Sequence, residues 1–348
     1  MTLTRRGLAL AAVVVLSLGQ AALYGPRSLN AVVAPGVVAL GVAVLYVRRI
    51  DQPELERVAP DDGFASERRT VRLELSADSS FTGRLVDRVD EGLTAEDNDR
   101  TTTVGEGTIT YEVTYRRRGR HTIGPSSITA RDVLGLAEKT FTYHNEHEVL
   151  VYPRVHDLTG RARHELNLLP EFREISMRNE FDSLREYERG DSLRDVHWKT
   201  SAKRPDEDLF VKEYTAEDDL GSLSVVAEAA SSREAADAMA EAAASVISFL
   251  LAAGLTVGLS TPEGVLDPGE GRIQRQRMLE LLARTGPGRV PESERADADV
   301  VVSADRAGSA TIRIDGRELP FERLRGTGQP DDIDPWSPSE AVTAGADQ

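Results

Sequence analysis

Two long apolar segments without charge place the strongest constraint on what this chain can fold into. They cover Gly7–Tyr24 and Leu29–Val47, and they are 18 and 19 residues long. At about 1.5 Å of rise per helical residue, each would span about 27–28 Å, which is close to the hydrocarbon thickness of a bilayer. The Gly-Pro-Arg-Ser turn at 25–28 joins them. The pattern therefore predicts a transmembrane helical hairpin over residues 1–50.

Arginines flank the outer ends of this predicted hairpin. One pair (5–6) precedes the first segment and another (48–49) follows the second, whereas the turn holds only Arg27. This excess of positive charge predicts that the bulk of the chain is cytoplasmic, and that the protein is a multi-pass, two-helix protein of the cell membrane. The alternative interpretation is a cleaved signal peptide at the N-terminus. In that case the second segment would still hold the remainder inside the cell.

The charge balance excludes several classes of function. The chain carries 58 acidic and 42 basic residues, for a net charge of −16, and nearly all of its basic residues are arginines. Nucleic acid is not expected as a partner, because phosphate binding needs a basic footprint. An acidic surface poor in lysine suits a halophilic protein. Cysteine is absent, so neither disulfides nor thiolate metal sites can form.

Alternating polar and apolar residues dominate the chain from 54 to 153. Clear examples are Arg69–Ser76 and Thr108–Tyr115, and turn residues separate such runs. Seven or so short strands of this kind predict an antiparallel, Ig-like β-sandwich. The acidic stretch Glu91–Arg100 is expected to be an exposed loop.

Strands and helices alternate over residues 219–320. Apolar strands are expected at Ser222–Ala227, Leu255–Ser260, Asp299–Ser303 and Ala310–Ile314, with helices at Ala235–Ala253 and Ile273–Thr285. This alternation predicts an α/β domain with a parallel sheet. The fold class is thus an α+β multidomain chain. Residues 326–348, rich in Gly, Pro and Asp, are expected to form a disordered tail.

An irregular polar junction, 154–218, lies between the two predicted domains and contains the densest cluster of charged and aromatic residues. Its residues 180–204 combine basic, acidic and aromatic side chains without a helical or strand period. Arginine forks bind carboxylates, and Trp and Tyr anchor interfaces. The residues that we single out are Arg185, Tyr187, Gly190, Asp191, Arg194, His197, Trp198, Lys199 and Arg204.

The order and spacing of these residues resemble the signature of the family called domain of unknown function 58 (DUF 58). The family pattern runs Arg-x-Tyr, Gly-Asp, Arg, Trp-Lys, a small residue, Ala and a basic residue, and residues 185–204 follow it. Two upstream segments are also similar to the family: a basic-Gly-basic run that ends in Gly124-Pro125, and the turn Asp132–Leu136. In that turn Val133 stands where proline is usual. Val151-Tyr152-Pro153 matches the family's closing strand.

The resemblance implies a membrane anchor and a C-terminal domain similar to the von Willebrand factor A domain. It also implies a partner, a MoxR-type AAA+ ATPase, and a role in the assembly or maturation of other protein complexes. The expected function is therefore that of a non-enzymatic scaffold or adaptor beside the lipid bilayer. The client and the oligomeric state are not predicted.

One departure from the von Willebrand pattern concerns its cation site. Those domains bind a divalent cation through Asp-x-Ser-x-Ser after the first strand, and Mg²⁺ needs such hard oxygen ligands. Here the corresponding residues are 226–232, in which Glu228 replaces the aspartate, Ala230 removes a hydroxyl and Ser232 keeps one. We interpret this as a degenerate site and predict no bound metal.

The junction has three competing interpretations. A buried latch between the two domains is favoured over an exposed docking surface, because Gly-Asp and Trp-Lys at fixed offsets indicate backbone constraints. The third is a hydrolase-type enzyme centred on Asp191 and His197, but the chain lacks a nucleophile elbow. It also lacks a Walker loop and a dinucleotide turn, so no cofactor is expected. An envelope protein with inverted topology is the remaining alternative.

Overall fold

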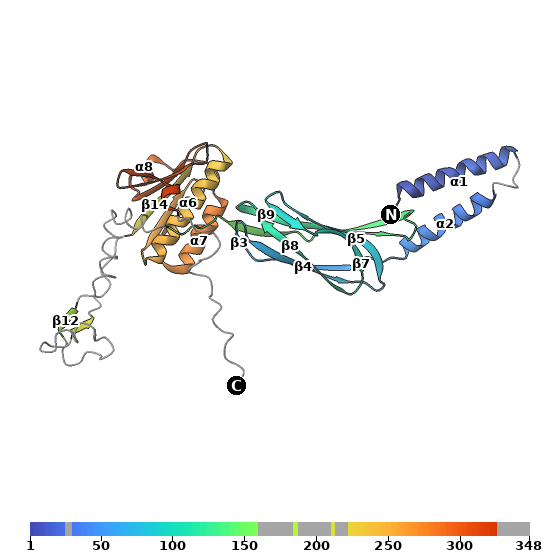
Figure 1. Ribbon diagram of the computed structural model, residues 1–348, viewed down its shortest axis with the longest axis horizontal. Helices are drawn as coiled ribbons and strands as arrows, with labels where there is room; N and C mark the ends of the chain where they lie inside the picture. Colours follow the sequence, from blue (N-terminus) through green and yellow to red (C-terminus); the bar gives the residue numbers. More distant parts are fainter. Residues whose placement is uncertain (25–29, 159–183, 187–209, 213–221, 326–348) are drawn as a thin grey trace, which may run out of the picture. The chain divides into compact units, whose positions relative to one another are not determined.

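The computed structural model has a mixed α/β fold in which sheets predominate (Figure 1). The chain divides into two compact units, Met1–Val151 and Tyr152–Gln348. The structure describes residues 1–24, 30–158, 184–186, 210–212 and 222–325.

The first unit begins with two apolar helices, α1 (Arg5–Tyr24) and α2 (Asn30–Arg48). They pack closely, because a Cβ at Gly36 would lie 2.6 Å from Cγ2 of Val14. The buried positions of the two helices recur at helical spacing: Gly7, Val14, Ser17, Val33, Gly36, Ala43 and Val47. The outward faces are apolar and exposed, with Leu8, Val13, Val15, Leu16, Leu18, Val37, Val38, Val42, Leu45 and Tyr46.

Two apolar helices among the described residues bear on membrane association. One is α6 (Arg233–Ala252), which has the length and composition of a membrane span but is 72% buried in the second unit, as a core helix is. The other is the shorter run Val33–Arg48 within α2. Length and composition of this kind are weak evidence for a membrane, so the number of spans and their direction remain predictions.

Two antiparallel sheets form the rest of the first unit. One has four strands in the order β2 (Glu54–Val58), β4 (Arg68–Ser76), β8 (Gly107–Tyr115), β6 (Leu93–Glu96). The other has seven: β1 (Thr2–Leu3), β10 (Ala137–Tyr143), β9 (Gly119–Arg131), β11 (His147–Tyr152) and β3 (Gly63–Phe64), with β5 (Phe81–Val89) paired to β9 and β7 (Asp99–Val104) paired to β5.

One hydrophobic core serves both sheets. Leu73 and Val113 of the four-stranded sheet share a buried cluster with Leu85 and Ile128 of the seven-stranded sheet. Two sheets that bury their inner faces against each other have the layering of a β-sandwich. The sequence predicted this layering, although it predicted fewer strands.

The acidic stretch Glu91–Arg100 is not the loop that we predicted. It forms β6 and the start of β7, with a turn at Asp97, where φ is +62°. Leu93 is buried and anchors β6 in the core. The many charges hid this strand, because only one face of it contacts the core while the acids face solvent.

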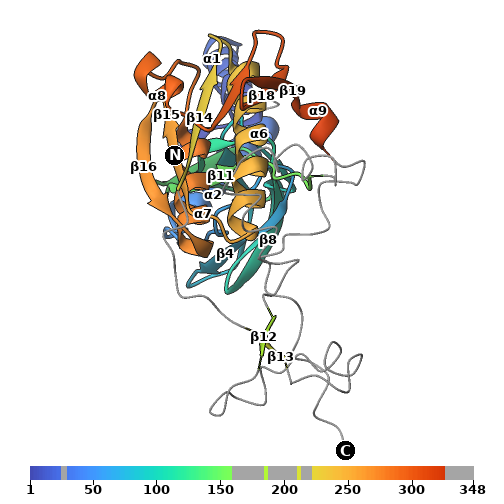
Figure 2. The ribbon, with the colours of Figure 1, turned by 90° about the vertical axis from the view of Figure 1, so that its left-hand side faces the viewer.

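The second unit is built on a six-stranded sheet. Its strands lie in the order β16 (Gly264–Gly269), β15 (Val257–Thr261), β14 (Leu223–Ala229), β17 (Val300–Ala304), β18 (Ala310–Ile314), β19 (Arg317–Pro320). Helices α6 and α7 (Gly271–Arg284) pack together, and α6 contacts β14, β17 and β18 (Figure 2). Two short helices complete the unit, α8 (Glu292–Ala296) and α9 (Phe321–Leu324).

The prediction of a parallel sheet was correct only for the centre. β14 pairs in parallel with β15 and β17, whereas β16, β18 and β19 join the sheet antiparallel. β16 and β19 follow their neighbours through short turns, and a short turn can only reverse the chain. The predicted strand at Ala310–Ile314 is present, but it runs against the central three.

The second unit also holds the segment Tyr152–Leu158 in place. Gln276 on α7 donates its Nε2–H to the hydroxyl of Tyr152 at 2.6 Å, and the backbone N–H of His156 donates to Ser245 Oγ on α6 at 2.9 Å. The His156 ring meets Phe321 edge-on, with 5.8 Å between centroids. The start of the predicted junction is therefore packed against helices.

Candidate functional site

Most of the predicted signature residues lie outside the described residues: Tyr187, Gly190, Asp191, Arg194, His197, Trp198, Lys199 and Arg204. Arg185 lies on the short strand β12 (Leu184–Glu186). This strand pairs antiparallel with β13 (Phe210–Lys212), and Arg185 is opposite Val211. The register joins the start of the signature to Val211 and Lys212. Whether the stretch is a latch or a surface stays a prediction.

The degenerate cation site is described in full, and it lies at the carboxyl end of the central strand β14. β14 is followed by α6 and then by β15 on one side, while β17 lies on the other side. This is the topological switch point of the sheet, where α/β proteins commonly bind ligands. Glu228 is next to Ser303 of β17 in the sheet. Because side chains alternate along a strand, the two residues share one face.

A buried carboxylate is the main feature of this site. Glu228 is only 5% exposed, and its Oε1 lies 3.4 Å from Nε of Arg295 on α8. Its other oxygen, Oε2, is buried without a hydrogen-bond partner among the described residues. Residues that flank α8 cover the same face, since Val290 and Ala298 pack with Val226 and Val301. Burial of an ionised carboxylate needs such a neighbouring cation.

Ser232, the other retained residue of the site, has a structural role. Its Oγ accepts the backbone N–H of Ala235 at 3.1 Å and donates to the carbonyl of Arg306 at 3.4 Å. Ser232 is thus the N-cap of α6. The serine hydroxyl is used to satisfy the first turn of the helix.

These contacts do not fit a divalent cation. Arg295 already supplies the positive charge beside Glu228, and Ser232 is committed to the helix. In the parts of the chain that the structure describes, no three side chains among His, Cys, Asp and Glu come together as a metal site would need. We interpret the carboxyl end of β14 as a cation site in which an arginine occupies the electrostatic role of the metal.

Replacement of Arg295 tests this interpretation. We expect Arg295→Met to lower the free energy of unfolding of the second unit by about 1–3 kcal/mol, because Glu228 would stay buried without a cation. The double variant Glu228→Gln/Arg295→Met should recover part of the loss. The measurement is denaturant-dependent hydrogen exchange of β14 in the full chain.

The matched control is Arg317→Met, which removes an exposed arginine from β19 of the same sheet. We expect this control to behave like the unmodified chain. Equal effects of Arg295→Met and Arg317→Met would contradict the assigned charge partnership.

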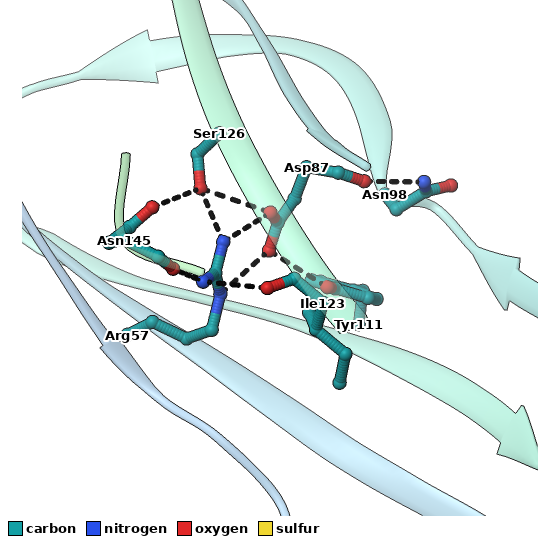
Figure 3. A network of polar contacts seen from close by, with 7 residues as sticks. All are labelled: Arg57, Asp87, Asn98, Tyr111, Ile123, Ser126 and Asn145. Carbon is teal, nitrogen blue, oxygen red and sulfur yellow. Dashed lines mark hydrogen bonds and ion pairs between the residues drawn. The ribbon is translucent and has the colours of Figure 1, made fainter. Parts of the chain in front are cut away.

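The first unit contains a second buried polar cluster, which sequence reasoning missed (Figure 3). The side chains of Arg57 on β2 and Asp87 on β5 are 3% and 0% exposed, and they form an ion pair. Arg57 Nε donates to Asp87 Oδ2 at 3.2 Å, and Tyr111 donates its hydroxyl to the same oxygen at 2.8 Å. Ser126 donates to Asp87 Oδ1 at 3.0 Å. β2 and β5 belong to different sheets, so this pair connects the two layers.

The electrostatics of the cluster keep the Tyr111 hydroxyl protonated. The pKa of the Tyr111 hydroxyl is far above its ordinary value, chiefly because the group is buried and secondly because Asp87 carries a negative charge beside it. Arg57 also donates through Nη1 to the carbonyls of Ile123, at 3.2 Å, and of Asn145. Asp87 therefore receives several hydrogen bonds, and the guanidinium is likewise satisfied. A buried network whose ion pair is satisfied on both sides favours a structural role over substrate binding.

The family-like element that ends in Gly124-Pro125 borders this network, and Gly124 leaves room for the Arg57 side chain. Its φ is +113°, a backbone conformation that glycine adopts without strain, and a Cβ there would lie 3.1 Å from Arg57 Nη1 and 3.2 Å from the Asn145 carbonyl. Any larger residue would press on the guanidinium. The Gly124-Pro125 element was therefore the available signal in the sequence, but its partner Arg57 lies 67 residues before Gly124 and carries no motif.

Comparison with known proteins identifies a family for part of the chain. Residues 183–313 match the model described as "Protein of unknown function DUF58". This confirms the resemblance that the signature residues indicated, over a range that includes both the signature and most of the six-stranded sheet. No curated protein matches the chain.

Solved structures show only distant similarity. A chain in the complex of zinc 2-glycoprotein and prolactin inducible protein from human seminal plasma has 11% identity and a TM-score of 0.24, with 30% of this chain and 96% of that chain covered. The alpha-2-macroglobulin of Escherichia coli has 10% identity and a TM-score of 0.25, covering 35% of this chain and 26% of that one. The CARDB domain of a Pyrococcus furiosus protein, with di-metal ions, has 15% identity and a TM-score of 0.21, covering 29% and 94%. Similarity at this level carries no argument about function.

Proposed function

We propose that this chain, whose residues 183–313 match the DUF58 family model, is a membrane-anchored scaffold that faces the cytoplasm. The observation that carries the proposal is that α1 and α2 pack against each other on one face and expose apolar side chains on the other. Small and aliphatic residues let the helices approach closely, as at Gly36 and Val14. Their outward faces are exposed and apolar. Water is a poor solvent for such a pair, whereas acyl chains would cover it.

The direction of the anchor follows from the arginines. Residues 5–6 and 48–49 are exposed at the base of the two helices, where the chain enters the sandwich. Positive charge at both ends favours a cytoplasmic location for the two units. A halophilic source, proposed from the acidic composition, does not change this argument, because the rule concerns the residues next to the spans.

The α/β unit is the proposed docking module, similar to a von Willebrand A domain. At its switch point Glu228 lies beside Arg295 and Ser232 caps α6, so both retained residues of the cation-site pattern make structural contacts. By family resemblance, the proposed partner is a MoxR-type AAA+ ATPase. The ATPase would supply energy for assembling or maturing other complexes, while this chain supplies location at the membrane and a docking surface.

Topology is the first test of the proposal. We expect a C-terminal tag to be degraded by protease only after intact cells are opened. A tag at the turn 25–28 should instead be accessible from outside. Accessibility of the C-terminal tag in intact cells would overturn the cytoplasmic orientation and favour the inverted envelope protein.

Affinity purification of the full chain from detergent-solubilised membranes is the second test. We expect an AAA+ ATPase to be retained, and Trp198→Ala to release it without loss of folding if the signature is a docking surface. Loss of folding in that variant would instead indicate the latch. Purification that recovers no ATPase, from cells shown to express one, would contradict the proposed partner.

A further inference from the structure

The turn between β9 and β10 presents two apolar side chains that no described residue covers. Val133 is 95% exposed and Leu134 is 58% exposed. The turn is nevertheless firmly held, because Asp132 accepts the backbone N–H groups of Leu134, Leu136 and Ala137 at 2.9, 2.7 and 2.7 Å. Three such bonds to one carboxylate fix the backbone. The exposure of the valine and leucine is therefore a built feature of the turn.

The same turn is attached to the base of the helical hairpin. The backbone N–H of Thr4 donates to the Leu136 carbonyl at 3.0 Å, and the Thr4 hydroxyl donates to the Gly135 carbonyl at 2.5 Å. Leu136 and Ala137 share a buried cluster with Ala43 and Val47 of α2. The turn thus contacts both helices.

The height of this contact along α2 decides what surrounds the turn. Ala43 precedes Arg48 by five residues, which corresponds to about 7.5 Å of helix. Leu136 therefore packs beside the apolar part of α2, beyond the arginines in the direction of the predicted bilayer. A turn at this level cannot be far from the boundary between head groups and acyl chains.

We propose that the turn Asp132–Leu136 is a third membrane contact, which inserts Val133 and Leu134 into the cytoplasmic interface of the lipid bilayer. The inference rests on the proposed membrane anchoring. Two observations favour lipid over a protein as the occupant. The two exposed apolar side chains lie in a turn whose Leu136 and Ala137 pack against Ala43 and Val47 of α2. Four exposed arginines, at 5–6 and 48–49, flank the two helices, where anionic head groups would meet them. Apolar side chains at the tip and basic residues beside them are the composition of an interfacial anchor.

Fluorescence quenching by lipids provides the test, and the absence of cysteine in the chain allows single labels. The full chain with Val133→Cys would carry an environment-sensitive dye in nanodiscs of phosphatidylcholine and phosphatidylglycerol. Glu91→Cys is the control, because Glu91 is exposed and lies at the other end of the sheet from the turn. Glu91 follows the end of β5 where Val89 pairs with Ile123, whereas the turn follows the end of β9 where Ala130 pairs with Gly83. Val15→Cys marks the hairpin, where the valine is 66% exposed.

We expect lipids with a quencher on the acyl chain to reduce the Val133 signal several-fold more than the Glu91 signal. Equal quenching at Val133 and Glu91, with strong quenching at Val15, would overturn the turn's insertion while leaving the anchor intact. Absence of quenching at Val15 would remove the membrane anchor itself and the inference with it. Quenching at Val133 that disappears in Val133→Cys/Leu134→Asp would support insertion of the apolar tip.

Discussion

Asp87→Ala is expected to lower the free energy of unfolding of the β-sandwich by about 3–5 kcal/mol, because it leaves the Arg57 guanidinium buried without its counter-ion. The Arg57 side chain is 3% exposed and has no access to solvent that could compensate the charge. Tyr111 and Ser126 would also lose their acceptor. Few single substitutions in a sheet have a larger effect. Denaturant-dependent hydrogen exchange of β5 and β9 in the detergent-solubilised full chain measures the loss.

Two variants separate the ion pair from a general effect of the substitution. Asp99→Ala removes an aspartate from β7 of the same sheet. Its partner Arg84 has a side chain that is 54% exposed, so we expect little change in stability. Arg57→Met/Asp87→Leu replaces both charges by apolar groups and should recover much of the stability. Asp87→Ala and Asp99→Ala with the same stability would contradict a structural role for the buried pair.

The central part of the α/β fold could be predicted because each element carries its own signal. β14, β15 and β17 are rich in apolar residues, and α6 has a long apolar face, so burial on both sides of the sheet is visible in the sequence itself. β16 was missed because its residues Gly264–Gly269 include Asp267 and Pro268. Such residues are tolerated at an edge, where a strand pairs on one side only.

The buried network could not be predicted for a different reason. Arg57 and Asp87 are ordinary charged residues in strands that alternate with apolar neighbours, and nothing local marks them as buried. Their pairing depends on how two sheets face each other, which is a property of the tertiary fold. Gly124 carried a visible motif, yet the reason for it is an arginine of another strand. The Glu228–Arg295 pair is similar, since α8 is too short to be recognised in the sequence.

Gly7→Ala is expected to separate the hairpin from the sandwich, because there is no space for a methyl group at that position. A Cβ on Gly7 would lie 2.0 Å from the carbonyl oxygen of Leu136 and 2.9 Å from its carbonyl carbon. The obstacle is backbone, which cannot rotate away as a side chain can, so α1 or the turn must move. The hydrogen bond from Thr4 to Leu136 would then be strained or broken. We expect a cost of about 1–3 kcal/mol and faster hydrogen exchange at residues 4–8 in nanodiscs.

Gly19→Ala is the matched control, because Gly19 lies in the same helix and a Cβ there meets nothing within 4 Å. Alanine favours helix over glycine, so this variant should show no loss of stability. The pair of variants also links the docking of the hairpin to the membrane contact of the turn. If Leu136 holds Val133 and Leu134 at the bilayer, Gly7→Ala should weaken lipid quenching of a dye at Val133, whereas Gly19→Ala should leave it unchanged. Identical behaviour of the two glycine variants would mean that the turn is not positioned by its contact with α1.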